Sequence, residues 1–305
     1  MLKNNILNTV KYFDIFHYPL TAWECYHWLF GKADSIEYAD FTVELDNMVE
    51  LKELETSDGF YYLPGQAKHT QIRQSRYLIA QLKYNIAIKA VKIIRSLPYI
   101  KYIAVCNSLA YNNASIGSDI DLFIIAEKGK LWRARFVAAT LMQLLHWRPT
   151  EKTSKDKICL SFLVAENGLN LEPVAIDNDI YFKYWLIQLV PLYDPTNLHE
   201  KLLKANEFWL RPDLSNHLIY QTNEFRKVKD NWFSRIIKFI LEIILWPKFI
   251  ESFLRRLQFA ILSNELKIIA NKDKRVVMND TTLKFHLLDR REQYRDKYLE
   301  KISHV

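Results

Sequence analysis

Alternation of polar and apolar residues is clearest near residue 120. An apolar run over residues 100–106 leads into a turn of small residues, after which the sequence Asp119-Ile-Asp-Leu122 alternates strictly. Side chains two residues apart on a strand point the same way, so Asp119 and Asp121 should share one face while the aliphatic residues beside them enter the core. The pattern therefore predicts a buried strand that carries two neighbouring carboxylates.

The first 65 residues predict three helices followed by a hairpin. Helical apolar spacing covers residues 5–17, 22–30 and 38–51, and Thr21 is placed to cap the second helix. Asp58-Gly59 separates two short runs of strand-forming residues, which is a strong hairpin signal. This order of elements resembles a winged helix.

Helical spacing and a few strand signals describe the rest of the chain. A long helix is predicted over residues 67–97, where Pro98 ends it, and a shorter one over 130–146. Strands are predicted at 158–164 and 169–174, joined by the turn Glu166-Asn-Gly168. The remaining predicted helices cover residues 198–206, the apolar stretch 232–262 with a break at Pro247, and the charged tail 282–302.

These elements predict an α+β protein in three parts. Residues 1–66 are expected to form the winged-helix-like domain, and residues 198–305 a helical C-terminal domain. Between them, residues 67–197 should form a small mixed β-sheet with flanking helices, in which 67–97 is the connecting helix.

Composition narrows the class of protein. Half of the 305 residues are apolar and a quarter are charged, which is typical of a globular protein. The three cysteines and eight histidines lack ligand spacing, so zinc, haem and iron–sulfur chemistry find no support. The N-terminus lacks the pattern of a secretory signal, and Lys238 and Glu242 interrupt the most apolar segment. We therefore expect a cytoplasmic protein with no transmembrane segment.

The net charge of +7 is unevenly distributed. Residues 1–65 carry 4 Lys and Arg against 11 Asp and Glu, and acids such as Asp40, Asp46 and Glu50 follow the third helix. Because DNA affinity depends on neutralising phosphates, duplex DNA is not an expected partner, and a protein-contacting or structural role fits this domain better. Residues 66–118 carry 8 basic residues and no acid. A solvated basic face is the preferred interpretation, and a face bordering a phosphate site is the alternative.

The motif around the aspartate pair carries the chemistry. Asn107-Ser108 follows the apolar run, and Gly117-Ser118 precedes the Asp119-x-Asp121 strand. This arrangement resembles the polymerase-β-like nucleotidyltransferase superfamily, with Asn107 in place of the family's glycine. The resemblance implies the nucleotidyltransferase fold for the central sheet, one or two Mg²⁺ ions on the aspartates, and nucleoside triphosphate phosphates at Ser108. An ordinary strand with a solvated aspartate pair is the alternative.

A third carboxylate is the missing part of the motif. The strand over 158–164 offers only Cys159 and Ser161 at alternating positions, while Asp156 lies before it and Glu172 on the predicted partner strand. We take Glu172 as the third catalytic acid, because its face of that strand is polar.

The expected activity is metal-dependent transfer of a nucleoside monophosphate to an acceptor hydroxyl on a small molecule, a protein or RNA. A catalytically degenerate relative that binds nucleotide or protein is the alternative. A third interpretation is a membrane-surface protein, based on residues 232–262 and their basic flanks. We favour packing of this stretch on the sheet.

Overall fold

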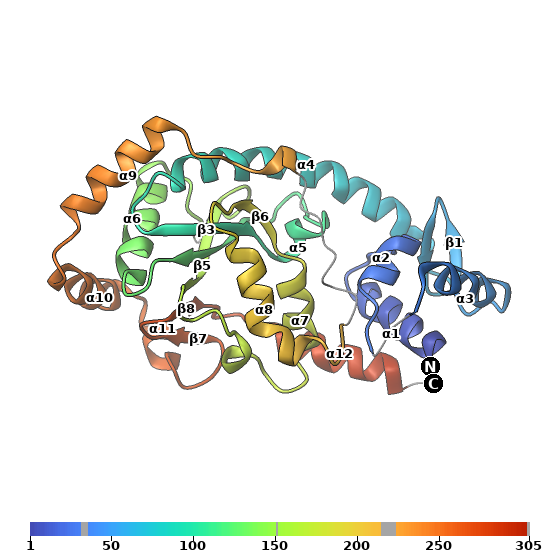
Figure 1. The fold of residues 1–305 in the computed structure, drawn as a ribbon. Coiled ribbons are helices and arrows are strands. Elements are labelled where there is room, and N and C mark those ends of the chain that lie inside the picture. Colours follow the sequence, from blue (N-terminus) through green and yellow to red (C-terminus); the bar gives the residue numbers. More distant parts are fainter. Residues whose placement is uncertain (32–35, 151, 215–223, 304–305) are drawn as a thin grey trace.

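The computed structural model describes residues 1–31, 36–150, 152–214 and 224–303 (Figure 1). These residues form a mixed α/β structure around a six-stranded sheet of order β6-β3-β4-β5-β8-β7. Strands β4 and β5 are parallel, and the other neighbouring pairs are antiparallel. The strands are β3 (Ile100–Val105), β4 (Ile120–Ala126), β5 (Ile158–Ala165), β6 (Val190–Tyr193), β7 (Val276–Met278) and β8 (Thr282–Phe285).

The N-terminal part has the predicted order of three helices and a hairpin. Helices α1 (Leu2–Asp14), α2 (Ala22–His27) and α3 (Tyr38–Glu50) precede the antiparallel strands β1 (Glu55–Ser57) and β2 (Phe60–Tyr62). Thr21 caps α2 together with Glu24, since each side chain bonds the other residue's backbone N–H. Asp58 and Gly59 form the hairpin turn, both at positive φ, so the turn prediction is confirmed.

Helices cover both faces of the central sheet. The long helix α4 (Lys68–Ile94) and α6 (Leu131–Leu144) pack against one face, where Ile103, Leu122 and Ile124 are buried. Helices α7 (Ile180–Ile187) and α8 (Leu198–Leu210) pack against the other, where Phe123 is buried. The same second core takes in α1, α2 and α3, so the N-terminal part is continuous with the sheet rather than separate from it.

The predicted strand over 169–174 is wrong. Residues Glu172–Val174 form the 3₁₀ helix η1, and the antiparallel neighbour of β5 is β8. Pro173 has no N–H to give to a ladder, and the Leu171 N–H donates to the side chain of Asn206 at 2.7 Å. A Cβ on Gly168 would meet the Thr281 carbonyl oxygen at 2.8 Å. The glycine that suggested a hairpin therefore makes room for the β7–β8 turn.

The C-terminal part is not only helical, which corrects the expectation for residues 198–305. Strands β7 and β8 complete the central sheet, and β8 lies in the tail that was predicted to be helical. Helix α12 (Arg291–Ser303) contacts α1 and α7, so the two ends of the chain lie together (Figure 1). The other C-terminal elements are η3 (Glu224–Arg226), α9 (Trp232–Ile244), α10 (Phe249–Ile261) and α11 (Asn264–Ile269).

The apolar stretch 232–262 is only partly as predicted. It breaks into α9 and α10 at Pro247, as expected. The expectation that its apolar residues pack inside is wrong, because most of its large apolar side chains are exposed. No helix in the described ranges is both long enough and apolar enough to span a bilayer.

Candidate functional site

The two aspartates lie together at the start of β4, as the alternation predicts. Ile120 and Leu122 enter the core beneath α4 and α6, whereas Phe123 enters the core on the opposite side. The carboxylates of Asp119 and Asp121 therefore open toward the α7 face of the sheet. Cys159 pairs with Asp121 on the parallel neighbour β5. Ligand atoms of Asp119, Asp121 and Cys159 all lie within 4.8 Å of one another, the group among the described residues that could hold a metal ion.

Electrostatics at this group favour a bound cation. Burial, followed by the charge of Asp119, raises the pKa of Asp121 to about 6. Burial also raises the pKa of Asp119 and keeps the Cys159 thiol protonated, with its pKa well above the usual value. The two carboxylates present hard oxygen ligands that suit Mg²⁺ when waters and phosphate oxygens complete its shell, whereas the neutral Cys159 thiol is a soft sulfur that stands beside them. The donor set therefore fits the implied ion.

Asn107 occupies the left-handed region with φ of 57° directly after β3 and Cys106. Asparagine tolerates this conformation better than most residues, so the turn forms here without a glycine. Its Nδ2 donates to Asp121 Oδ2 at 2.7 Å, and the Tyr181 hydroxyl donates to its Oδ1 at 3.3 Å. Asn107 therefore orients one carboxylate, which glycine could not do.

The other predicted site residues flank the aspartates. Ser108 is half-buried in the four-residue helix α5 (Asn107–Ala110). Gly117 is exposed, and the Ser118 carbonyl oxygen accepts a hydrogen bond of 2.7 Å from Lys83 Nζ on α4. Lys83 is 2% exposed and also donates to the Ile116 carbonyl at 3.3 Å. This buried lysine fastens the turn that delivers Asp119 to the strand.

The basic face of α4 is less solvated than expected. Besides Lys83, Arg73 makes two 2.7 Å contacts with the Glu24 carboxylate. Arg76 donates to the Phe16 carbonyl at 2.9 Å. These cations join α4 to the N-terminal part and to the turn before β4, which explains why the helix carries them without acids of its own.

Neither proposed third acid joins the aspartate pair. Asp156 accepts a hydrogen bond from Lys83 Nζ at 2.6 Å, so its carboxylate is paired. Glu172 is exposed at the start of η1, not on a strand of the sheet. Within the described ranges, the third member of the group is the thiol of Cys159.

A pocket opens beside Asn107, and its far side comes from the C-terminal segment. Aromatic rings of Tyr181, Phe182 and Trp185 on α7 form one wall. The opposing wall follows β8 and includes the exposed Arg290. The remaining lining residues are Asn107, Phe162, Lys284, His286, Leu288, Asp289, Arg291 and Tyr294. The pocket therefore combines a flat apolar surface with a basic rim next to the carboxylate pair.

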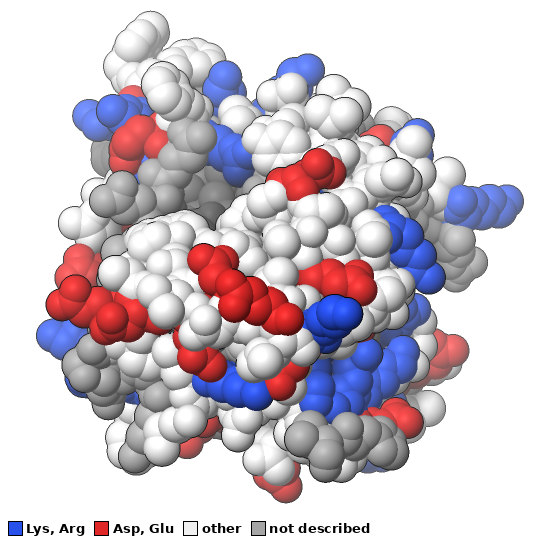
Figure 2. Space-filling view, turned by 90° about the vertical axis from the view of Figure 1, so that its right-hand side faces the viewer, with Lys and Arg blue, Asp and Glu red and all other residues white. Residues whose placement is uncertain are grey.

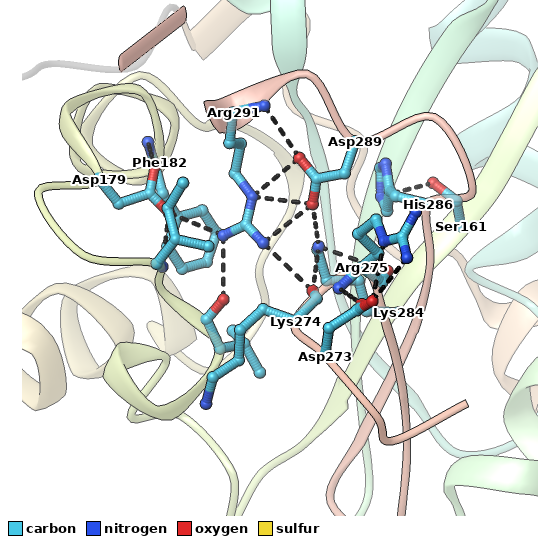
Figure 3. Close-up of polar contacts among 12 residues, drawn as sticks. Ser161, Asp179, Phe182, Asp273, Lys274, Arg275, Lys284, His286, Asp289 and Arg291 are labelled. Atoms are coloured by element: carbon cyan, nitrogen blue, oxygen red, sulfur yellow. Dashed lines mark hydrogen bonds and ion pairs between the residues drawn. The ribbon is translucent and has the colours of Figure 1, made fainter. Parts of the chain in front are cut away.

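Buried ion pairs hold that wall in place (Figure 3). The Arg291 guanidinium donates to Asp179 at 2.7 Å and to both oxygens of Asp289 at 2.9 and 3.0 Å. Lys284 also donates to Asp289 at 2.7 Å. Burial tends to raise the pKa of Asp289, but these two cations outweigh it and lower that pKa. Because Asp179 caps α7, the network ties the C-terminal wall to the aromatic one.

His286 and Arg290 differ from these paired groups. His286 shares a hydrogen bond of 3.2 Å with Ser161 on β5, and burial lowers its pKa to about 4, so the ring is neutral. Arg290 faces two adjoining pockets and makes no hydrogen bond through its side chain within the described residues. It is the basic group at this rim that remains available to an anionic ligand.

The pocket wall along β8 was not predicted from the sequence, because residues 282–302 were predicted to be helical. The signal was present in the short runs 276–278 and 282–285, which include Val276, Val277, Thr282 and Phe285 and flank the turn residues Asn279-Asp280. No known protein family, curated protein or solved structure matches this chain.

Proposed function

We propose that this protein is nucleotidyltransferase-like and transfers a nucleoside monophosphate from a triphosphate to an acceptor hydroxyl. The observation that carries the proposal is the placement of Asp119 and Asp121 on one face of β4, with Asn107 aligned on Asp121. Mg²⁺ held by the two carboxylates would supply charge neutralisation at the reacting phosphate. The acceptor can be a small molecule, a protein or an RNA end.

In this proposal, the residues of the protein bind the triphosphate and position it for transfer. The turn at Asn107 and Ser108 would contact the phosphates, and the Gly117-Ser118 turn, fastened by Lys83, fixes the approach to Asp119. Arg290 would contact the phosphates from the pocket rim, and the rings of Tyr181 and neighbouring residues, which line the pocket, would pack against the base. Positioning and electrostatic stabilisation of this kind supply most of the catalysis in phosphoryl-group chemistry.

The N-terminal part fits a winged-helix-like domain that contacts protein rather than DNA. Figure 2 looks onto this side of the molecule and shows acidic side chains across the middle of the face. Asp40, Asp46 and Glu50 on α3 are exposed. An acidic surface of this kind repels a phosphate backbone.

Calorimetry of the full chain with Mg²⁺ and each of the four nucleoside triphosphates tests the proposal. We expect saturable, Mg²⁺-dependent binding that Asp119→Asn and Asp121→Asn both abolish. The control variant Asp46→Asn, which changes an exposed acid on α3, should leave the binding intact. Transfer is then followed with triphosphate labelled in the α-phosphate. Absence of Mg²⁺-dependent binding in the wild-type protein would refute the proposal.

A second candidate is a degenerate site that binds nucleotide without transferring it. The observation that favours it is Cys159, which stands beside Asp121 on β5 and adds a neutral thiol to the pair where a third acid is expected. The variant Cys159→Asp separates the two candidates. If the natural site is degenerate, the wild-type protein should bind nucleotide without transferring label, and Cys159→Asp should transfer it. If the natural site is active, the wild-type protein should itself transfer label. Glu172→Gln should not alter either result, since Glu172 lies outside the group.

A further inference from the structure

Helices α9 and α10 are amphipathic in the reverse of the usual sense. Helices on a protein surface normally bury the apolar stripe and expose the polar one. Here two of the three buried side chains of the helices are polar, Ser234 and Gln258, and the third is Leu254. By contrast, Phe239 and Phe253 are 63% and 60% exposed. The pair lies at the end of the molecule opposite the N-terminal helices (Figure 1).

Hydrogen bonds hold the polar inner side in place. The Tyr99 N–H donates to Glu242 at 3.2 Å, and the Trp132 N–H donates to Glu251 at 2.8 Å. Gln258 donates to the Trp132 carbonyl at 2.8 Å. Rotating either helix to bury its apolar side would break these bonds and leave the N–H groups of the buried residues Tyr99 and Trp132 without their acceptors, so the outward orientation is built into the fold.

The corner between the helices is equally constrained. Arg133 of α6, 1% exposed, donates to four successive carbonyls from Leu245 to Lys248 at 2.6, 3.3, 3.0 and 3.1 Å. These carbonyls follow Ile244, the last residue of α9, and those of Pro247 and Lys248 also accept the first backbone hydrogen bonds of α10. The guanidinium therefore fastens the corner that joins the two helices. Pro247 completes the break. Both helices are therefore fixed relative to the sheet.

The outer side of the two helices is strongly apolar and aromatic. Its side chains recur at three- and four-residue steps, which places them on one stripe of each helix. We call this stripe the outer apolar face. Its residues are Trp232, Phe233, Ile236, Phe239, Ile240, Ile243, Ile244, Trp246, Phe249, Phe253, Leu257 and Ile261, each at least 36% exposed.

The exposed charged side chains that α9, α10 and the corner between them carry are all basic. The exposed charged residues within 232–261 are Arg235, Lys248, Arg255 and Arg256, and the two acids of this stretch point inward. Arg255 pairs with Asp280, while the other three cations make no ion pair among the described residues. A second copy packed symmetrically on this face would bring cations against cations, which disfavours self-association.

We propose that the outer apolar face docks on an anionic lipid membrane surface, with α9 and α10 lying in the interface plane. Interfacial helices combine a bulky apolar side with flanking Lys and Arg, which is the composition seen here. Tryptophans prefer the headgroup level, and Trp232 begins α9 while Trp246 lies in the corner two residues after that helix ends. This docking is independent of the nucleotide site and would hold that site near the membrane.

Sedimentation of the intact protein with vesicles tests the docking. We expect binding to phosphatidylcholine vesicles that contain phosphatidylserine, and weaker binding to phosphatidylcholine alone. Phe239→Glu or Phe253→Glu should lower the affinity by about tenfold or more, because each removes an aromatic ring that the lipid would bury on docking. Lys248→Glu and Arg256→Glu should each lower it by about fivefold or more, and added salt should weaken binding.

Leu78→Glu and Leu82→Glu are the matched controls, because both leucines are 67% exposed on α4, outside the outer apolar face. They should bind vesicles as the wild type does. The exposed position of Phe239 and Phe253 means that their variants should keep the wild-type melting temperature. A wild-type protein that stays in solution with both kinds of vesicle at physiological salt would overturn the proposal. So would self-association that Phe239→Glu abolishes in the absence of lipid binding.

Discussion

Asn107 donates a hydrogen bond to Asp121 across the gap between the turn after β3 and the start of β4, at 2.7 Å. The same asparagine has a φ of 57°, so one residue both makes the turn and orients a carboxylate. Replacing it by glycine separates these roles, since glycine keeps the backbone conformation and removes the amide.

The first prediction concerns this pair. The hydrogen bond stabilises ionised Asp121, so Asn107→Gly should raise the pKa of Asp121 further above about 6. Asn107→Ala should do the same and also lower the free energy of unfolding by about 1 kcal/mol through left-handed strain. NMR titration of the carboxyl and urea denaturation measure the two effects. An unchanged pKa in both variants would show that the bond does not stabilise the charge.

The second prediction concerns pH. A carboxyl whose pKa is raised to about 6 in the folded state binds its proton more tightly there than in the unfolded chain. The free energy of unfolding should therefore fall by about 2–3 kcal/mol as pH rises from about 4 to 6, and then level off. In Asp121→Asn this fall should disappear, leaving the variant more stable than wild type above pH 6. Urea denaturation across this range is the measurement, and parallel curves for the two proteins would contradict it.

The third prediction concerns the turn before β4. Lys83→Met leaves the carbonyls of Ile116 and Ser118 and the Asp156 carboxylate without their buried donor. The change should lower the free energy of unfolding by about 3–5 kcal/mol. Lys89→Met, at an exposed position of the same helix, should change it by less than about 0.5 kcal/mol. Equal melting temperatures for the two variants would show that Lys83 does not fasten the turn.

The fourth prediction contrasts two neighbouring arginines. Arg291→Ala removes the partner of Asp179 and Asp289 and should cost about 3–5 kcal/mol of stability. Arg290→Ala should leave the melting temperature unchanged but weaken Mg²⁺–triphosphate binding by about tenfold, because a charge-assisted phosphate contact is lost. Thermal denaturation and calorimetry of both variants distinguish a structural from a ligand-binding arginine. Unaltered nucleotide affinity in Arg290→Ala would remove Arg290 from the proposed site.

The fifth prediction concerns DNA. Helix α3 should make no contribution to duplex binding, because its exposed side chains include Asp40, Asp46 and Glu50. Fluorescence anisotropy with a labelled duplex should give the same weak, nonspecific signal for the wild type and for Glu50→Gln. The prediction would be contradicted if the wild type bound duplex in a salt-sensitive way and if replacing the exposed α3 side chains by alanine abolished that binding.

Local patterns in the sequence predicted the local parts of this structure. Strict alternation was sufficient to place Asp119 and Asp121 on one face, because strand side chains repeat every two residues. The hairpin at Asp58-Gly59 followed from turn chemistry in the same way.

The predictions that were wrong concern contacts between residues that are far apart in the sequence. The side of β5 that seemed to need a hairpin partner from 169–174 is filled by β8, and no local signal says which strand will pair there. Periodicity also showed that α9 and α10 have an apolar stripe without showing its direction. That direction follows from Arg133 and Glu251, whose bonds form only in the folded chain.

The pairing of β5 with β8 also governs how the chain can fold during synthesis. Leu163 pairs with Leu283, so one edge of β5 stays open to solvent until residues near 283 have emerged from the ribosome. Closing so long a loop is slow, and an uncovered edge strand can pair with other chains in the meantime. Truncation before β7 should therefore yield an aggregating product rather than a smaller domain.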